Sequence, residues 1–549
     1  MRFSSVRLTH NLARMPRPWP LLAGLMALLF GCSVGVLSAA TPVVGKARLT
    51  IVFILDGLRP DSIDPTETPN LYRLRQEGVN YLNSHAVFPT VTRVNAAALA
   101  TGAYPGTNGL VSNSMYVPAV NPNQAFSTGD AANLLKLDEV SGGRLLFLSS
   151  LGEVLQTYGR SLAAVSSGST GSALLLNHRA PQGVGYLVNG DLEPGVRVAY
   201  PDAVNTTILN RFGPYPSVGE GESADVRVNW TEDVLREYIL PELQPTVVFN
   251  WLTEPDGTQH ALGAGSPEAL ATIRNDDRQI GLILEQLSAL GLADVTNIFV
   301  ISDHGFSVHT FAVNVTQALI DAGLKASSSS DDVVLASSGQ SLLLHVENHD
   351  SERIRAIVRF LQEQEWIGVL FTAPHSLNRP RDPRGWVPGT FSLELIHSYN
   401  QERGADILMT FPWTSEKNVY GVPGTDFTNT GGRTGPVTDN SSGHGSMSPW
   451  TVHNTFFAWG VDFKDGINVR LPASNADIIP TILALLDIPD STARDGRVLL
   501  EALNDGPDPE QVPLRTQVYT TEIGNYAAAI QVSSVEGHLP YVDKSWRLR

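Results

Sequence analysis

Cysteine is almost absent from this sequence. Cys32 is the only one among 549 residues, and it lies in the N-terminal segment. A chain that loses this segment has neither a disulfide nor a thiol nucleophile, which excludes cysteine chemistry. Basic residues are also few, because 55 acidic side chains outnumber 38 lysines and arginines and give a formal net charge of −17. This charge argues against a protein that grips nucleic-acid phosphates by bulk positive charge, so an anionic substrate must be held locally, as metal ions would do.

Long apolar runs are also scarce. The run Leu21–Phe30 is preceded by four arginines and followed by the small residues Ser38–Ala40. This pattern predicts a secretory signal peptide over residues 1–39. The run is shorter than the ~20 residues of a membrane-spanning helix, so no transmembrane span is expected. Leu29–Cys32 also resembles a bacterial lipobox. We therefore expect an exported protein, periplasmic or secreted, with a lipid anchor on Cys32 as the alternative.

The rest of the chain has the composition of a globular protein, with 42% apolar and 17% charged residues. Strand-like apolar runs alternate with helical patterns from residue 48 to about 325, which predicts an α/β fold with a mostly parallel central sheet sandwiched by helices. We expect one catalytic domain over residues 48–505. Within it, the stretch of about 310–440 is predicted as an insertion or cap beside the site. Residues 506–549 are predicted as an antiparallel edge segment of the same domain.

Three of the predicted strands, at 49–55, 247–251 and 298–302, run directly or within a few residues into acidic or histidine side chains. In an open α/β sheet, ligands bind beyond the carboxyl ends of the strands, so these side chains are expected to share one crevice. A fourth segment, Gly443–Gly445, contributes another histidine. Three carboxylates and three imidazoles suit two divalent metals in mixed nitrogen and oxygen coordination. The candidate ligands are Asp56, Asp256, His260, Asp303, His304 and His444.

A hydroxyl group offers a nucleophile for such a site. The segment Phe88–Thr92 lies between the first ligand strand and a helix predicted over 95–101. A helix N-terminus presents free N–H groups and the positive end of the helix dipole to an anion. Thr92 is therefore placed to bind a metal through its hydroxyl oxygen and to attack phosphorus. The alternative interpretation is a threonine that only caps this helix.

Taken in the order in which they occur along the chain, these motifs and several further segments strongly resemble the alkaline phosphatase superfamily and, within it, the nucleotide pyrophosphatase/phosphodiesterase family. The resemblance implies that Thr92, rather than Thr90, is the nucleophile. It also implies that Asn113 donates a hydrogen bond to a phosphoryl oxygen. One zinc ion would be held by Asp56, Thr92, Asp303 and His304, and a second by Asp256, His260 and His444. The matching segments are 55–61, 88–95, 101–109, 113–115, 254–260, 302–305 and 443–445.

The resemblance predicts an exported phosphodiesterase or nucleotide pyrophosphatase with two divalent metal ions, zinc being the expected metal. Its substrate would be a small-molecule phosphodiester or nucleotide, cleaved through a covalent phosphothreonine on Thr92. One position departs from the family pattern, because Arg93 stands where an aromatic residue usually stacks on a nucleobase. Arginine could stack on a base or pair with a second phosphate, so Arg93 is a predicted substrate-binding residue.

The main alternative is an alkaline phosphomonoesterase of the same superfamily. Such enzymes also resemble this chain in using a threonine and an asparagine at the site, but they add a lysine and an arginine that bind the doubly charged monoester. The corresponding stretch over 165–171 contains no basic residue, which favours a diester. A phosphomutase-like transferase is disfavoured because the export signal separates it from cytosolic sugar phosphates. An inactive metal-binding envelope protein is disfavoured because all seven metal-contacting positions are present.

Overall fold

The computed structural model of the chain describes residues 44–189, 197–219, 222–376 and 382–549. The signal peptide predicted over 1–39, and with it Cys32, lies outside the described residues. Among the helices of the four described ranges, none is both long and apolar enough to cross a membrane.

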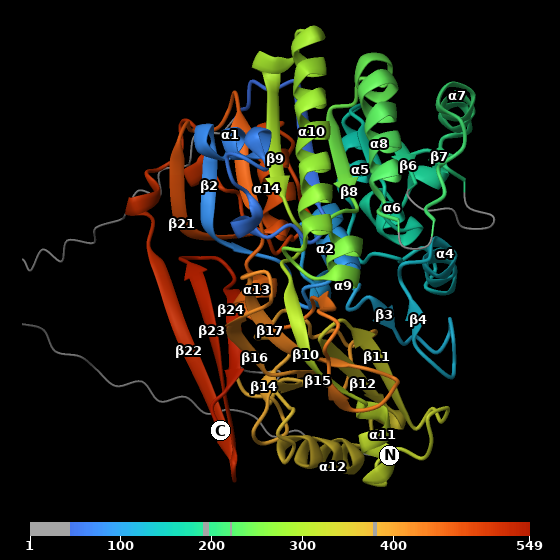
Figure 1. Cartoon of the computed structure of the whole chain (residues 1–549), viewed down its shortest axis with the longest axis vertical. Coiled ribbons are helices and arrows are strands. Elements are labelled where there is room, and N and C mark those ends of the chain that lie inside the picture. Colours follow the sequence, from blue (N-terminus) through green and yellow to red (C-terminus); the bar gives the residue numbers. More distant parts are fainter. Residues whose placement is uncertain (1–43, 190–196, 220–221, 377–381) are drawn as a thin grey trace, which may run out of the picture. The chain divides into compact units, whose positions relative to one another are not determined.

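A nine-stranded sheet forms the centre of the fold (Figure 1). Its strands, in spatial order, are β21 (Ile467–Ser474), β2 (Val79–His85), β20 (Phe456–Gly460), β9 (Thr296–Ile301), β1 (Leu49–Leu55), β8 (Val247–Leu252), β5 (Leu162–Ser166), β6 (Tyr186–Val188) and β7 (Ala199–Tyr200). The five consecutive strands from β9 to β6 are parallel, whereas β20 and β7 run antiparallel to their neighbours. The predicted α/β class with a mostly parallel central sheet is confirmed.

Helices cover both faces of this sheet. Side chains alternate between the two faces of a strand. In β1, Ile51 and Phe53 lie in the apolar cluster that contains the helices of one face, whereas Val52 and Ile54 lie in the cluster of the other. Because both faces are buried, β1 is apolar at almost every position. The first face carries α1 (Pro69–Glu77), α8 (Asp225–Val234) and α10 (Pro267–Ala289), and the second carries α2 (Thr92–Thr101), α5 (Leu151–Thr157), α6 (Thr170–Leu176) and α14 (Ile478–Leu485).

Two smaller sheets lie below the main sheet in Figure 1, in the stretch where the sequence predicts an insertion. One contains β10 (Ser307–Val313), β16 (Trp413–Lys417), β17 (Pro423–Asn429), β18 (Gly435–Pro436) and β19 (Ser442–Gly443). The other contains β11 (Val333–Ser338), β12 (Ser341–Val346), β13 (Leu370–Thr372), β14 (Phe391–Ser392) and β15 (Ile407–Thr410), beside the helix α12 (Ser351–Gln362). The strand β10 follows β9 after five residues, so this region begins at the segment that contains the predicted ligands Asp303 and His304.

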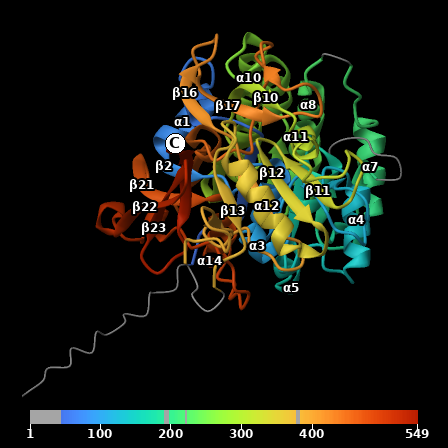
Figure 2. The ribbon, with the colours of Figure 1, turned by 90° about the horizontal axis from the view of Figure 1, so that it is seen from below.

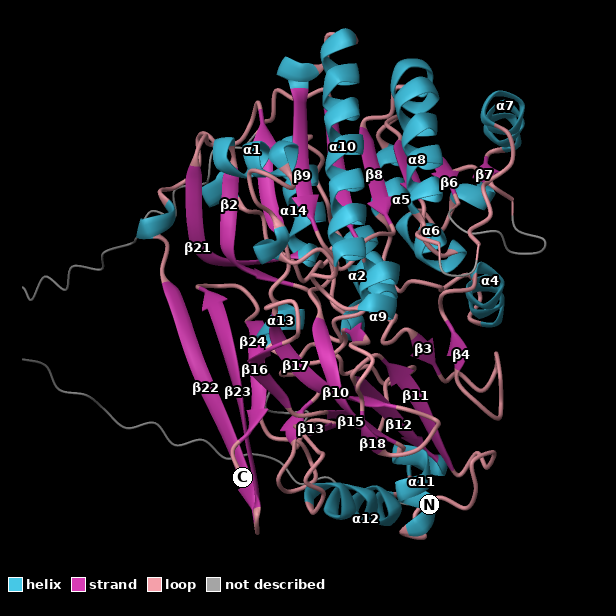
Figure 3. Ribbon diagram, in the orientation of Figure 1, coloured by secondary structure: helices cyan, strands magenta, loops and turns pink. Residues whose placement is uncertain are grey.

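The C-terminal residues form the antiparallel strands β22 (Leu514–Ile523), β23 (Tyr526–Val535) and β24 (Tyr541–Arg547). The sequence predicts an antiparallel edge segment here. The strands are antiparallel, but they form a sheet of their own beside β21 instead of extending the main sheet (Figures 2 and 3).

A buried ion pair joins this C-terminal sheet to the main sheet. His85 at the end of β2 places its Nε2 2.8 Å from Asp543 Oδ1 in β24. The other carboxylate oxygen accepts from Gln531 Nε2 at 3.0 Å and from the Ser533 hydroxyl at 2.8 Å. Burial by itself would raise the pKa of Asp543, but the hydrogen bond from His85 helps to hold the pKa below its usual value.

We expect Asp543→Ala to lower the free energy of unfolding by about 1–3 kcal/mol, because it leaves three polar groups without their acceptor. A lowered pKa in the folded state contributes stability above the unfolded-state pKa of about 4, and this contribution is lost as the pH falls. The difference between wild type and variant in denaturant unfolding should therefore shrink below about pH 4. Asp505→Ala, at an exposed position, is the control and should change stability by less than about 0.5 kcal/mol. An equal effect of Asp543→Ala at pH 7 and pH 3 would contradict the assignment.

Candidate metal centre and nucleophile

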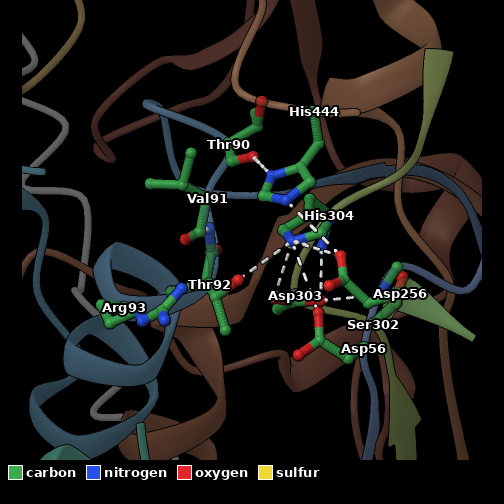
Figure 4. Close-up of polar contacts among 12 residues, drawn as sticks. Asp56, Thr90, Val91, Thr92, Arg93, Asp256, Ser302, Asp303, His304 and His444 are labelled. Atoms are coloured by element: carbon green, nitrogen blue, oxygen red, sulfur yellow. Dashed lines mark hydrogen bonds and ion pairs between the residues drawn. The ribbon is translucent and has the colours of Figure 1, made fainter. Parts of the chain in front are cut away.

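The parallel pairing of β1, β8 and β9 brings the predicted ligands to one edge of the sheet. Asp56 follows β1 directly, Asp303 and His304 follow β9, and Asp256 begins the helix α9 (Asp256–Leu262) just after β8. His260 lies one turn further along α9. Figure 4 shows the side chains of Asp56, Asp256, Asp303 and His304 directed toward one another. The structure therefore assembles what the sequence predicted from separate strand ends.

His444 reaches this edge from the smaller sheet. Its preceding strand β19 pairs with β10, and Ser307 lies opposite Gly443 in that pairing. The rings of His304 and His444 stack with centroids 3.5 Å apart and an interplanar angle of 10°. All six predicted carboxylate and imidazole ligands thus converge.

Two sets of ligand atoms are close enough to surround a cation. Asp256, His260 and His444 form one set, and Asp56, Asp256 and His304 form the other. Asp256 Oδ1 lies between them, 3.4 Å from His260 Nε2, 3.5 Å from His444 Nε2 and 4.0 Å from His304 Nε2. Asp303 Oδ2 is 3.0 Å from His304 Nε2. Asp256 belongs to both sets, whereas the family resemblance assigns it to one metal.

The carboxylates carry oxygens that lack a hydrogen-bond partner. Asp56 Oδ1, Asp256 Oδ1 and Asp303 Oδ2 are buried and accept no hydrogen bond from any described residue. Buried polar atoms are normally paired, and buried charges are normally neutralised by a counter-charge or a metal. These three oxygens, together with the three imidazole Nε2 atoms, make a donor set that fits divalent cations.

Backbone carbonyls fix the orientation of all three imidazole rings. Nδ1 of His260 lies 2.8 Å from the Ser442 carbonyl, Nδ1 of His304 lies 3.1 Å from the Gly305 carbonyl, and Nδ1 of His444 lies 2.9 Å from the Thr90 carbonyl. A carbonyl can only accept, so each Nδ1 must carry the proton. A neutral ring then presents the lone pair on Nε2 to a metal.

The pKa shifts reflect the crowding of like charges. Burial, followed by the negative charges of Asp303 and Asp256, raises the pKa of Asp56 well above its usual value. Burial lowers the pKa of His444 well below its usual value, which favours the neutral ring that a metal requires. Burial would lower the pKa of His260, but the charge of Asp256 and the hydrogen bonds to Asp256 and to the Ser442 carbonyl together outweigh it and raise this pKa. Bound cations would relieve the repulsion among the carboxylates.

Thr92 is the first residue of α2, and Val91 occupies the capping position without a side-chain cap. The alternative of a capping role for Thr92 is therefore wrong. Its hydroxyl oxygen lies 3.4 Å from His304 Nε2, on the side of the ligand cluster (Figure 4). A hydroxyl at the start of a ten-residue helix, next to metal ligands, is suitably placed for attack on phosphorus.

Asn113 and Arg93 lie next to the nucleophile. The backbone N–H of Arg93 donates to Asn113 Oδ1 at 3.0 Å, which leaves the amide NH₂ group of Asn113 as the donor for a ligand. The side chain of Arg93 lies on the other side of Thr92 from the carboxylates in Figure 4. The structure thus places both predicted residues beside Thr92.

The structure adds two residues that the sequence prediction missed. Trp251 Nε1 donates to Asp56 Oδ2 at 3.0 Å across 195 positions of the chain. Thr90 orients His444 through its carbonyl, and its hydroxyl donates to the Ser446 carbonyl at 3.0 Å and accepts from the Gly445 N–H at 3.1 Å. No local pattern signals either contact, because both partners lie far away in sequence.

The family model described as type I phosphodiesterase/nucleotide pyrophosphatase matches residues 50–371. This match covers more than half of the chain and most of the ligand segments. The chain belongs to this family. His444 lies outside the matched residues, and the pairing of β19 with β10 brings it to the site.

Curated relatives within the family match only part of their own length. Venom phosphodiesterase 2 of Crotalus adamanteus is 26% identical over 260 residues, covering 46% of this chain and 26% of the relative. The mouse ectonucleotide pyrophosphatase/phosphodiesterase family member 3 is 24% identical over 259 residues, covering 46% of this chain and 24% of the relative. The match thus spans about a quarter of these relatives.

Solved structures agree in fold. Human ectonucleotide pyrophosphatase/phosphodiesterase 5 superposes with a TM-score of 0.56 at 16% identity, covering 83% of this chain and 100% of that one. An inactive variant of the murine protein in complex with AMP gives a TM-score of 0.55 at 17% identity, covering 83% and 99%. At these identities the likeness establishes the alkaline phosphatase-like fold.

We expect Thr90→Val to weaken the affinity for a divalent metal by roughly 10- to 100-fold, because the loss of its hydroxyl loosens the Gly445–Ser446 turn that carries His444. Competition with a chelator measures this affinity on the purified protein. The number of metal ions bound per chain is compared with that of wild type. Thr90→Ser retains the hydroxyl and should stay within about three-fold of wild type. Equal metal affinity in Thr90→Val and wild type would show that this contact does not position His444.

Proposed function

We propose that the protein is a two-metal phosphodiesterase or nucleotide pyrophosphatase that acts through a phosphothreonine on Thr92. One observation carries the proposal. The Thr92 hydroxyl begins α2, has no capping role and lies 3.4 Å from His304 Nε2, beside three carboxylates whose buried oxygens lack partners. Membership in the type I phosphodiesterase/nucleotide pyrophosphatase family supports the same chemistry.

The donor set supports two zinc ions. Zinc accepts imidazole nitrogen and carboxylate oxygen together, and the site offers three of each. Asp56, Thr92, Asp303 and His304 would hold one ion, and Asp256, His260 and His444 the other. When bound, such a pair supplies positive charge that activates a hydroxyl nucleophile and stabilises the entering and leaving oxygens of an in-line displacement.

The reaction proposed for the side chains has two steps. The Thr92 oxygen loses its proton to solvent and forms a bond to phosphorus while the bond to the leaving oxygen breaks, and the leaving oxygen takes up a proton from solvent; the products are a phosphothreonine that keeps the other ester substituent and a free alcohol or phosphate. A water molecule then attacks the phosphothreonine, releases the phosphate monoester and returns the hydroxyl to Thr92. In both steps, the Asn113 NH₂ group and the N–H groups at the start of α2 would donate to the equatorial oxygens.

The surroundings of Thr92 favour a diester over a monoester. Gly168 lies beside Trp251, the residue that donates to Asp56, so the stretch over 165–171 adjoins a neighbour of the site. This stretch contains no lysine or arginine. A neutral amide such as Asn113 can hydrogen-bond the extra charge of a monoester but cannot neutralise it.

Export of the protein is part of the proposal. Its support is the pattern of arginines, apolar run and small residues over 1–39, together with relatives that include venom phosphodiesterases and ectonucleotide pyrophosphatases. A lipid anchor on Cys32 remains the alternative to a periplasmic or secreted form.

Thr92→Ala should lose roughly three decades or more of kcat/KM toward a p-nitrophenyl diester, because no other hydroxyl replaces the nucleophile. Thr92→Ser keeps a hydroxyl and should retain far more activity. Mass spectrometry of the acid-quenched wild-type enzyme should find the phosphoryl group on Thr92. Detection of that group on Thr90, or near-normal turnover of Thr92→Ala with an unchanged unfolding midpoint, would refute the assignment.

The metal-loaded enzyme should also have a higher kcat/KM for bis(p-nitrophenyl) phosphate than for p-nitrophenyl phosphate. Each missing charge-assisted contact to the monoester is worth about 1.5–3 kcal/mol, or about one to two decades in rate. Initial rates with the two aryl substrates at one pH and one metal concentration measure the ratio. A faster reaction of the monoester would favour the phosphomonoesterase alternative.

A further inference from the structure

The guanidinium of Arg93 has no anionic partner in the described parts of the chain. No carboxylate of the described ranges lies within ion-pair distance of it, and its Nε is buried without a hydrogen-bond partner. Arg93 is partly buried, and a guanidinium held partly out of water without a counter-charge is available to a bound anion. Such an arginine next to a nucleophile is suited to an anion that a ligand supplies.

The guanidinium lies close to a glycine. A Cβ added at Gly129 would overlap Nη2 of Arg93 and crowd its Cζ, so the guanidinium lies directly against the backbone there. The same segment holds Asn113, because Thr128 donates to the Asn113 carbonyl from its N–H at 2.9 Å and from its hydroxyl at 2.7 Å. The cation and the phosphoryl-binding amide are therefore fixed by one short loop.

The position of Arg93 indicates which part of a substrate it meets. In an in-line displacement, the leaving group departs on the side opposite the attacking oxygen. Arg93 neighbours Thr92 in α2, and in Figure 4 its side chain lies across Thr92 from the carboxylates, so the leaving group, opposite the attacking oxygen, is the part more distant from it. The ester substituent that stays on phosphorus is the part within its reach.

We infer that Arg93 selects phosphodiesters whose retained alcohol carries a second anionic group, a carboxylate or a phosphate. This inference rests on the proposed function. Because the formal net charge is −17, the chain as a whole does not attract anions. Selection of an anionic substrate must therefore come from the cation at Arg93 itself. Gly129 contributes by leaving the space that the guanidinium occupies.

Two matched substrates test this role: p-nitrophenyl 3-carboxypropyl phosphate and its 3-carbamoylpropyl analogue, which differ by one negative charge at nearly equal size. Wild type should prefer the carboxylate substrate in kcat/KM by about 10- to 100-fold. Arg93→Met should bring this ratio close to one. Gly129→Ala keeps the charge but displaces the guanidinium, and it should reduce the ratio as well. Arg359→Met, on the exposed side of α12, is the control and should leave the ratio unchanged.

An equal rate for both substrates in wild type, or a preference that survives Arg93→Met, would overturn the inference. A loss in Arg93→Met that affects p-nitrophenyl phosphate alone would also overturn it, since Arg93 would then bind the reacting phosphate. If neither diester is hydrolysed, the proposed function fails. The ratio of their dissociation constants in calorimetry, for wild type against Arg93→Met, would still decide the role of Arg93.

Discussion

The gathering of three carboxylates at one edge of the sheet, with Asp56 and Asp303 buried and Asp256 partly buried, is the constraint on which the site depends. Parallel pairing of β1, β8 and β9 brings Asp56, Asp256 and Asp303 to the same edge of the sheet, where each keeps one oxygen without a hydrogen-bond partner. The pKa of Asp56 is raised by burial and then by the other two charges. A protein that keeps such an arrangement needs cations to neutralise it, and the imidazoles around it supply the remaining ligands.

The surrounding structure orients the three imidazoles and supplies one of them. Backbone carbonyls fix the three imidazoles, so that each presents Nε2 to the centre of the cluster. The smaller sheet supplies one of these rings, because β19 pairs with β10 and β10 follows the ligand segment after β9. The smaller sheet therefore contributes His444, which lies just after the stretch predicted as an insertion.

Much of this could be expected from the sequence, and the errors are informative. The helix that carries the nucleophile is predicted from residue 95, but α2 begins at Thr92 itself. Capping preferences favour threonine before a helix, whereas here Val91 takes that position and the Thr92 hydroxyl is directed to His304. Tertiary contacts outweighed the local preference. The resemblance assigns Asp256 to one metal, and this assignment stays a prediction, because in the structure Asp256 belongs to both groups of ligand atoms.

The sequence by itself determined the class of fold and the identity of the candidate ligands. Mostly apolar strands that are followed by aspartate and histidine can be recognised locally, because burial on both faces dictates their composition. Only the tertiary structure decided the contacts between distant segments: Trp251 with Asp56, Thr90 with His444, and the guanidinium of Arg93 against Gly129. Such contacts depend on strand register and on close packing, which no local pattern of residues encodes.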